Sequence, residues 1–204
     1  MSGLKVVLAS RSPARLATLR SAGVDPEVVV SGFDEDSITE ADPSRLVAAL
    51  ARAKVGVIAD RLPAGDLVVI GCDSVLDFEG EIHGKPADAG QATRRWQRLR
   101  GRTGVLRTGH HVLLRRDGAE ADLTRVASTT VHFADLADAE IAAYVATGEP
   151  VEVAGAFTLD GLGGAYVTGI EGDPHNVVGI SLPLLRTMLA ELGVAWHTLW
   201  RPTP

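Results

Sequence analysis

The stretch LVVIGCD, residues 67–73, places an acid after a continuous apolar run, a pattern typical of a central strand in an α/β sheet. Leu67 to Ile70 show no polar alternation, which predicts a strand buried on both faces. We expect this strand to end in Gly71-Cys72-Asp73. Open α/β sheets bind ligands beyond the carboxyl ends of their strands, where metal-binding and base carboxylates are usually found. Asp73 fits that place, although an Asp is commoner there as an ordinary turn or cap residue.

Outward from this strand, the chain alternates strand and helix signals. A short apolar strand over residues 4–9 precedes Ser12-Pro13, which is a good helix start, and Gly23 ends that helix. The other expected elements are helices over 43–59, 88–101, 138–147 and 182–192, a Glu79-Gly80 turn, and a long hairpin over 105–133 around Asp117-Gly118. This order predicts an α/β protein with a mixed twisted sheet and helices on both faces.

Composition limits the kind of protein and its partners. The 204 residues are 46% hydrophobic and lack a linker, so we expect one domain over residues 1–204, or two tightly packed lobes. The net charge of −6 argues against a nucleic acid polymer as partner. Apolar runs are too short for a membrane span, and the one cysteine allows no internal disulfide bond. We therefore expect a cytoplasmic protein with no membrane partner.

Lys54 is out of place in the helix expected over 43–59. The apolar residues that we expect on one face of this helix are Leu46, Leu50, Ala53 and Val57. Lys54 falls between Leu50 and Val47, inside the apolar arc. A buried lysine needs an anionic partner, whereas a lysine at the rim of the core can extend its amine to water. Position alone leaves these two alternatives equal.

Two further charged positions are candidates for a site. Lys85, in Gly84-Lys85-Pro86, lies between a glycine that permits close approach and a proline that keeps the lysine extended. Such a lysine suits a phosphate oxygen, but a lone GKP is more often a solvated loop. Glu35, in an acidic triplet, could supply a metal ligand, although such triplets are usually solvated.

The stretch LASRSPARLATLR, residues 8–20, places serines and arginines where a strand passes into a helix. The unpaired N–H groups of a helix start can be satisfied by a capping side chain or by an anion. Ser12 before Pro13 suits a cap, and Arg11 and Arg15 could face an anion, but spacing alone does not separate the two alternatives. The two arginines, the two lysines and Asp73 together form a plausible set for a polyphosphate and its divalent metal.

Three blocks of this sequence resemble the Maf family in order and spacing, over roughly residues 4–192. The opening LASRSPARLATLR resembles the family's LASxSPRRxxLL. CDSVLDFEGEIHGKPADAGQA, residues 72–92, resembles its DTVV…GKPxD…A block. GAFTLDG, residues 155–161, and GIEGDPHNVVGISLPLL, residues 169–185, resemble its GxYxIxG and GxxxNVVGLPL segments.

The resemblance implies a nucleoside triphosphate pyrophosphatase that cleaves between the α- and β-phosphates. It also implies an architecture like that of the ITPase-like enzymes, with a cleft between two lobes, a divalent cation (Mg²⁺, Mn²⁺ or Co²⁺), and a possible homodimer. Carried over by position, Ser10 and Arg15 would contact phosphates, and Lys54 and Lys85 would hold the polyphosphate. Glu35 and Asp73 would serve the metal, with Asp73 as the general base. The substrate-binding set would also include Ser74, Asp160 and Asn176.

Three departures from the family pattern bear on the choice of base: Ala14, Ser74 and Asp160. Ionised Asp160 can only accept hydrogen bonds, whereas the glutamine common there both donates and accepts. We hypothesise a shift away from dTTP and UTP toward bases that present N–H donors, such as guanine derivatives or cytosine. The alternative is that Asp160 only orders its glycine-rich loop.

A second class of function for the whole protein is a non-catalytic nucleotide-binding regulator of septum formation.

Overall fold

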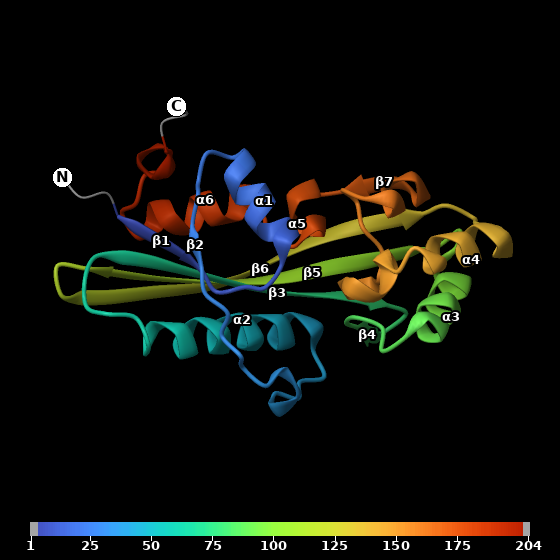
Figure 1. The fold of residues 1–204 in the computed structure, drawn as a ribbon, viewed down its shortest axis with the longest axis horizontal. Coiled ribbons are helices and arrows are strands. Elements are labelled where there is room, and N and C mark those ends of the chain that lie inside the picture. The colour runs from blue at the N-terminus through green and yellow to red at the C-terminus, as the bar shows by residue number, and fades with distance from the viewer. Residues whose placement is uncertain (1–3, 202–204) are drawn as a thin grey trace. The chain divides into compact units, whose positions relative to one another are not determined.

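The computed structural model describes residues 4–201, in which one mixed sheet of seven strands is accompanied by six α-helices (Figure 1). The strand order is β2-β1-β3-β5-β6-β7, with β4 beside β3. β1 pairs in parallel with β2 and β3, whereas β3–β4 and β6–β7 are antiparallel. The strands are β1 (Lys5–Leu8), β2 (Glu27–Val28), β3 (Leu67–Phe78), β4 (Glu81–His83), β5 (Thr103–Arg116), β6 (Ala119–Phe133) and β7 (Val167–Glu171). The expected α/β class and mixed sheet are confirmed.

The helices are α1 (Pro13–Ser21), α2 (Pro43–Ala59), α3 (Ala89–Leu99), α4 (Asp138–Ala146), α5 (Pro174–Val178) and α6 (Leu182–Glu191). Ser12, Asp42 and Asp88 cap the first three of them, each side chain accepting a backbone N–H of the first turn. β5 and β6 meet at Asp117-Gly118, where both residues have the positive φ of a type I′ turn. Within residues 4–201, no helix is long and apolar enough to cross a membrane.

The chain divides into two compact units. The first comprises the described residues up to Asp73, Thr108–Ala127 and those from Gly179 onward. The second comprises Ser74–Arg107 and Ser128–Val178. Each unit has a hydrophobic core of its own.

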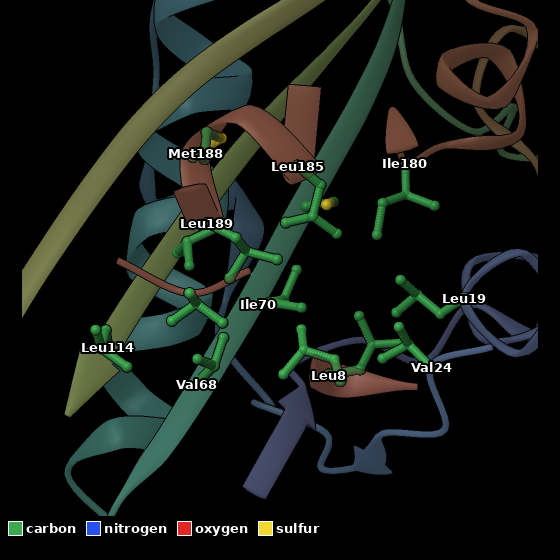
Figure 2. Packing of buried hydrophobic residues seen from close by; sticks show 14 residues of the cluster. Leu8, Leu19, Val24, Val68, Ile70, Leu114, Ile180, Leu185, Met188 and Leu189 are labelled. Atoms are coloured by element: carbon green, nitrogen blue, oxygen red, sulfur yellow. The ribbon is translucent and has the colours of Figure 1, made fainter. Parts of the chain in front are cut away.

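In the first unit, helices cover both faces of β1 and the start of β3. Figure 1 shows α1 and α6 on one side of these strands and α2 on the other. Leu8 and Ile70 pack with residues of α1 and α6 (Figure 2). Val7 and Val69, which point to the opposite face, pack with Val55 and Ile58 of α2. This two-sided burial explains why LVVI lacks polar alternation.

β3 is longer than the sequence suggested, because it continues through Gly71 to Phe78. Gly71 does not end the strand; it allows α2 to lie close to it. A Cβ atom at this position would lie 2.5 Å from Val55 Cγ2 and 2.8 Å from the carbonyl oxygen of Ala51. The parallel register between β1 and β3 does end at Ile70. Asp73 thus lies within β3, but beyond the part that is paired with β1.

The buried face of α2 also differs from the expected one. Its buried residues are Val47, Leu50, Ala51, Lys54, Val55, Ile58 and Ala59. Of the four residues expected to form the apolar face, only Leu50 is buried, and the other three are partly exposed. The position of Lys54 inside the apolar arc is confirmed, and the residue is buried there.

The core of the second unit is built around Trp96 of α3. Its ring makes edge-to-face contacts with Phe133, Tyr144 and Tyr166, with centroids 5.6 to 5.9 Å apart. Trp96 also donates its indole N–H to the carbonyl of Ala156 at 2.7 Å. This indole therefore joins the aromatic core to the glycine-rich segment.

Gly71→Ala is expected to destabilise the protein by about 1–3 kcal/mol, because the added methyl group would overlap α2. Gly56→Ala is the matched control, since Gly56 is exposed on α2 and a Cβ there meets nothing within 4 Å. Alanine favours a helix interior, so the control is expected to gain up to about 1 kcal/mol. Urea unfolding monitored by circular dichroism measures both changes. Equal stability of the two variants would contradict the role given to Gly71.

Candidate active site

The start of α1 is organised by two serines. Ser12 caps the helix by accepting the backbone N–H of Arg15 at 3.4 Å. Ser10 is buried, and its hydroxyl oxygen accepts the backbone N–H of Ser12 at 3.1 Å and Nη1 of Arg15 at 3.3 Å. The cap predicted at Ser12 is confirmed, and Ser10 lies against the arginine side chain.

Arg15 connects three segments of the first unit. Nε donates to the carbonyl oxygen of Gly179 at 2.8 Å, and Nη1 donates to the carbonyl oxygen of Cys72 at 2.8 Å. A Cβ atom on Gly179 would lie 3.1 Å from Arg15 Nε, so the glycine makes room for this guanidinium. Arg15 thereby fixes the backbone immediately before Asp73.

Lys54 and Asp73 form a buried ion pair. Lys54 Nζ lies 2.5 Å from Asp73 Oδ1, and the two residues are only 8% and 7% exposed. Lys54 Nζ also lies 2.8 Å from Glu35 Oε1, whose side chain remains 48% exposed. Of the two alternatives left open for Lys54, the structure shows the buried lysine with an anionic partner. The ammonium group thus joins one buried and one exposed carboxylate.

The surroundings of Asp73 change its ionisation. Burial raises the pKa of the Asp73 carboxyl, and the Lys54 ammonium and Arg15 guanidinium oppose that rise. The neighbouring Cys72 is fully buried, and burial raises the pKa of its thiol to about 11. The thiol therefore stays protonated, which leaves Asp73 as the group suited to accept a proton at this point of β3.

Glu35 and Asp73 fit the donor set of a hard divalent cation. Both carboxylates contact the ammonium nitrogen of Lys54, so they lie on the two sides of one bound cationic group. Mg²⁺ is typically held by one or two carboxylates together with waters and substrate phosphates. In the part of the chain that the structure describes, no cluster of three or more His, Cys, Asp or Glu side chains could hold a metal.

The other predicted site residues belong to the second unit. Ser74 follows Asp73 on β3 and is partly buried. Lys85 is exposed in the loop that follows β4. The carbonyl oxygen of Gly84, just before it, accepts Nη1 of Arg95 at 2.6 Å and the backbone N–H of Gly155 at 3.1 Å.

Asp160 is exposed in the glycine-rich segment, whose shape depends on Glu149. The Glu149 carboxylate accepts the Tyr144 and Thr158 hydroxyls and the backbone N–H groups of Leu162 and Gly163. Burial acts to raise the pKa of Glu149, but these hydrogen bonds outweigh it and lower the pKa. Glu149 therefore orders the glycine-rich segment through these four hydrogen bonds.

Asn176 of α5 is fully buried, in contrast to the exposed Lys85 and Asp160. Its amide nitrogen donates to the carbonyl oxygen of Leu106 at 3.2 Å and to the Thr129 hydroxyl at 3.1 Å. These bonds attach α5 to β5 and β6.

Arg95 and Glu149 were missed by the reasoning from sequence. Arg95 carried a usable signal, since it falls on the same face of α3 as Ala92, Trp96 and Leu99 and is buried with them. A cation within an apolar face is the pattern that singled out Lys54. Glu149 carried no such signal, because it lies in a short 3₁₀ helix, Glu149–Glu152, and bonds mainly to a loop.

Comparisons with known proteins agree with the geometry. A family model described as Maf-like protein matches residues 5–192. A protein of Streptomyces avermitilis named nucleoside triphosphate pyrophosphatase is 55% identical over 198 residues, which cover 97% of this chain and 95% of the relative. A protein of the same name from Salinispora tropica is 55% identical over 216 residues, covering 100% of this chain and 95% of the relative. The match extends over almost the whole length of all three.

Proposed function

The chain belongs to the family of Maf-like proteins, and on that premise we propose that it is a nucleoside triphosphate pyrophosphatase, a hydrolase. In this proposal, water attacks the α-phosphorus, and the products are a nucleoside monophosphate and pyrophosphate. The observation that carries the proposal is the buried contact of Lys54 with Asp73, with Glu35 on the same ammonium. A buried ion pair stabilises a fold weakly, so its presence favours a functional role.

Binding of the polyphosphate is assigned to the cations. A triphosphate and an attacking oxygen repel one another, and fixed positive groups offset that repulsion most strongly where water is excluded. Lys54 and Lys85 supply ammonium groups for phosphate oxygens. Ser10 supplies a hydroxyl donor beside the guanidinium of Arg15, at the positive end of α1. The structural bonds of Arg15 to Cys72 and Gly179 keep that guanidinium in place.

Proton removal is assigned to Asp73. Its carboxylate accepts the proton of the attacking water, and its raised pKa makes it a stronger base than an ordinary aspartate. Lys54 holds the carboxylate in one orientation through the contact to Oδ1. Arg15 fixes the adjacent backbone through the carbonyl of Cys72.

We assign a divalent cation to Glu35 and Asp73, whose carboxylate oxygens would hold it. When bound, such a cation neutralises phosphate charge and lowers the pKa of a nearby water. Glu35 is exposed enough to reach a bound ion without unfolding its surroundings. Asp73 would keep one oxygen for Lys54 and have its second oxygen available.

Loss of either principal charge is expected to lower turnover strongly, and because Asp73→Asn also removes the buried partner of Lys54, its stability is measured alongside. Asp73→Asn removes the base, and Lys85→Ala removes one ammonium clamp, so each is expected to lower kcat about a hundredfold or more. Pyrophosphate release from a panel of nucleoside triphosphates with Mg²⁺ or Mn²⁺ measures the effect, and circular dichroism checks the fold. A non-catalytic regulator of septum formation would bind nucleotides without metal-dependent release in this assay. Near wild-type release by either variant would refute its assigned role.

The pH dependence follows from the direction of the Asp73 shift. The ionised carboxylate is the active form, so kcat/KM falls as pH is lowered through the pKa of Asp73. Because burial raises that pKa, the midpoint of the acid limb is expected above the ordinary value of 3.8. In Lys54→Met the strongest opposing charge is lost, which moves the limb to still higher pH. An acid limb that stays in place in this variant would argue against Asp73 as the titrating base.

Base selectivity is assigned to the exposed Asp160, with Ser74 and Ala14 as the other departures from the family pattern. An ionised carboxylate accepts hydrogen bonds only, so it favours bases with N–H donors, such as guanine derivatives or cytosine. Asp160→Gln is expected to shift kcat/KM toward UTP and dTTP in a kinetic panel. A wild-type protein that already prefers UTP and dTTP over all other substrates would rule out this assignment.

A further inference from the structure

We infer that Arg95 is a positioning residue for the phosphate site: its guanidinium fixes the Gly84-Lys85-Pro86 loop and so places the Lys85 ammonium. This inference rests on the proposed role of Lys85. Arg95 belongs to α3 and is 7% exposed, whereas Lys85 is exposed in its loop. Arg95 therefore acts through the backbone beside Lys85 and not as a ligand of its own.

The hydrogen bond that carries the inference joins Arg95 Nη1 to the carbonyl oxygen of Gly84 at 2.6 Å. Bonds from a charged donor are stronger than those between neutral groups. Within residues 4–201, no carboxylate pairs with this guanidinium, and burial alone lowers its pKa. Burying a cation without a counter-ion costs free energy of folding. The hydrogen bond to the Gly84 carbonyl offsets part of that cost.

A second contact fixes the same carbonyl from another direction. The backbone N–H of Gly155 donates to the carbonyl oxygen of Gly84 at 3.1 Å. Gly155 has a φ of +75°, and a Cβ atom on it would lie 2.9 Å from Leu76 Cβ, so its position leaves little room for change. Trp96, the next residue of α3, holds the carbonyl of Ala156. Consecutive residues of one helix thus fix both the lysine loop and the segment packed against it.

The local chain then determines where Lys85 can go. Its carbonyl precedes Pro86, so steric contact with the proline ring keeps Lys85 extended. Gly84 is the flexible residue before it, and a Cβ at this glycine would meet nothing within 4 Å. The freedom of Gly84 is therefore restricted by the two hydrogen bonds to its carbonyl oxygen, of which the Arg95 bond is the shorter.

A double-mutant cycle tests the inference. Arg95→Met, Lys85→Ala and the double variant are compared for kcat, KM and the inhibition constant of inorganic pyrophosphate, which probes the phosphate site without chemistry. Arg95→Met is expected to weaken pyrophosphate inhibition and lower kcat/KM by about tenfold or more. Because Arg95 acts through Lys85, the double variant is expected to match Lys85→Ala. Additive losses would overturn the inference.

Arg94→Met is the matched control, because Arg94 neighbours Arg95 on α3, carries the same charge and is exposed. It is expected to behave as wild type. If Arg95→Met fails to fold by circular dichroism, Arg95→Lys takes its place in the cycle, since it keeps the charge and the aliphatic stem but loses the planar fork. Arg95→Lys is expected to lower kcat/KM and pyrophosphate inhibition less than Arg95→Met does. In the Lys85→Ala background it is expected to cause no further loss.

The outcomes separate this inference from the proposed function. Turnover by the wild-type protein with a silent Lys85→Ala would remove the role of Lys85 and the inference with it. A strong effect of Lys85→Ala combined with wild-type behaviour of Arg95→Met would overturn the inference alone. No turnover with any nucleotide, despite pyrophosphate binding that depends on Lys85 and Arg95, would contradict the proposed function and support the inference.

Discussion

The first unit must accommodate the buried ion pair of Lys54 and Asp73. Each charge would be costly alone in a water-poor interior, and loss of one partner of such a pair typically costs about 3–5 kcal/mol. The pair itself adds little stability, because desolvation offsets most of the attraction. Two neighbours reduce that cost: the Arg15 guanidinium opposes the effect of burial on Asp73, and Glu35 gives the ammonium a second acceptor.

Both units place one cation inside the apolar face of a helix. In α2 the ammonium of Lys54 meets carboxylates, and in α3 the guanidinium of Arg95 meets a backbone carbonyl. A point charge suits the first partner and a directional donor suits the second. Each helix thus uses one buried cation to fix a neighbouring group: α2 fixes the Asp73 carboxylate, and α3 fixes the loop at Gly84.

Local sequence signals predicted much of this fold, because caps and tight turns depend on neighbouring residues. The helix start at Ser12 and the Asp117-Gly118 turn belong to this group. The predicted end of β3 was wrong for a related reason. Locally, Gly71 has the pattern of a residue that ends a strand, whereas in the structure it allows α2 to lie close to β3. The Lys54 anomaly was visible because helical periodicity is local.

The partners of these residues depend on contacts between distant segments, which no local pattern encodes. Glu35 meets Lys54 from a loop, and Glu149 gathers hydroxyl and amide donors from separate turns. Arg95 could have been found by the criterion applied to Lys54. The family resemblance suggested roles for individual residues. Only the structure shows which of these residues contact and position one another.

The core of the first unit joins the two ends of the described chain: Leu8 and Leu19 pack with Ile180, Leu185 and Met188. During synthesis, β1 and β3 therefore leave the ribosome long before α6 can cover them. The second unit, drawn from Ser74–Arg107 and Ser128–Val178, has all its residues available earlier. Nascent chains of this protein must carry an uncovered apolar sheet face until α6 has been synthesised, which makes them natural clients for chaperones.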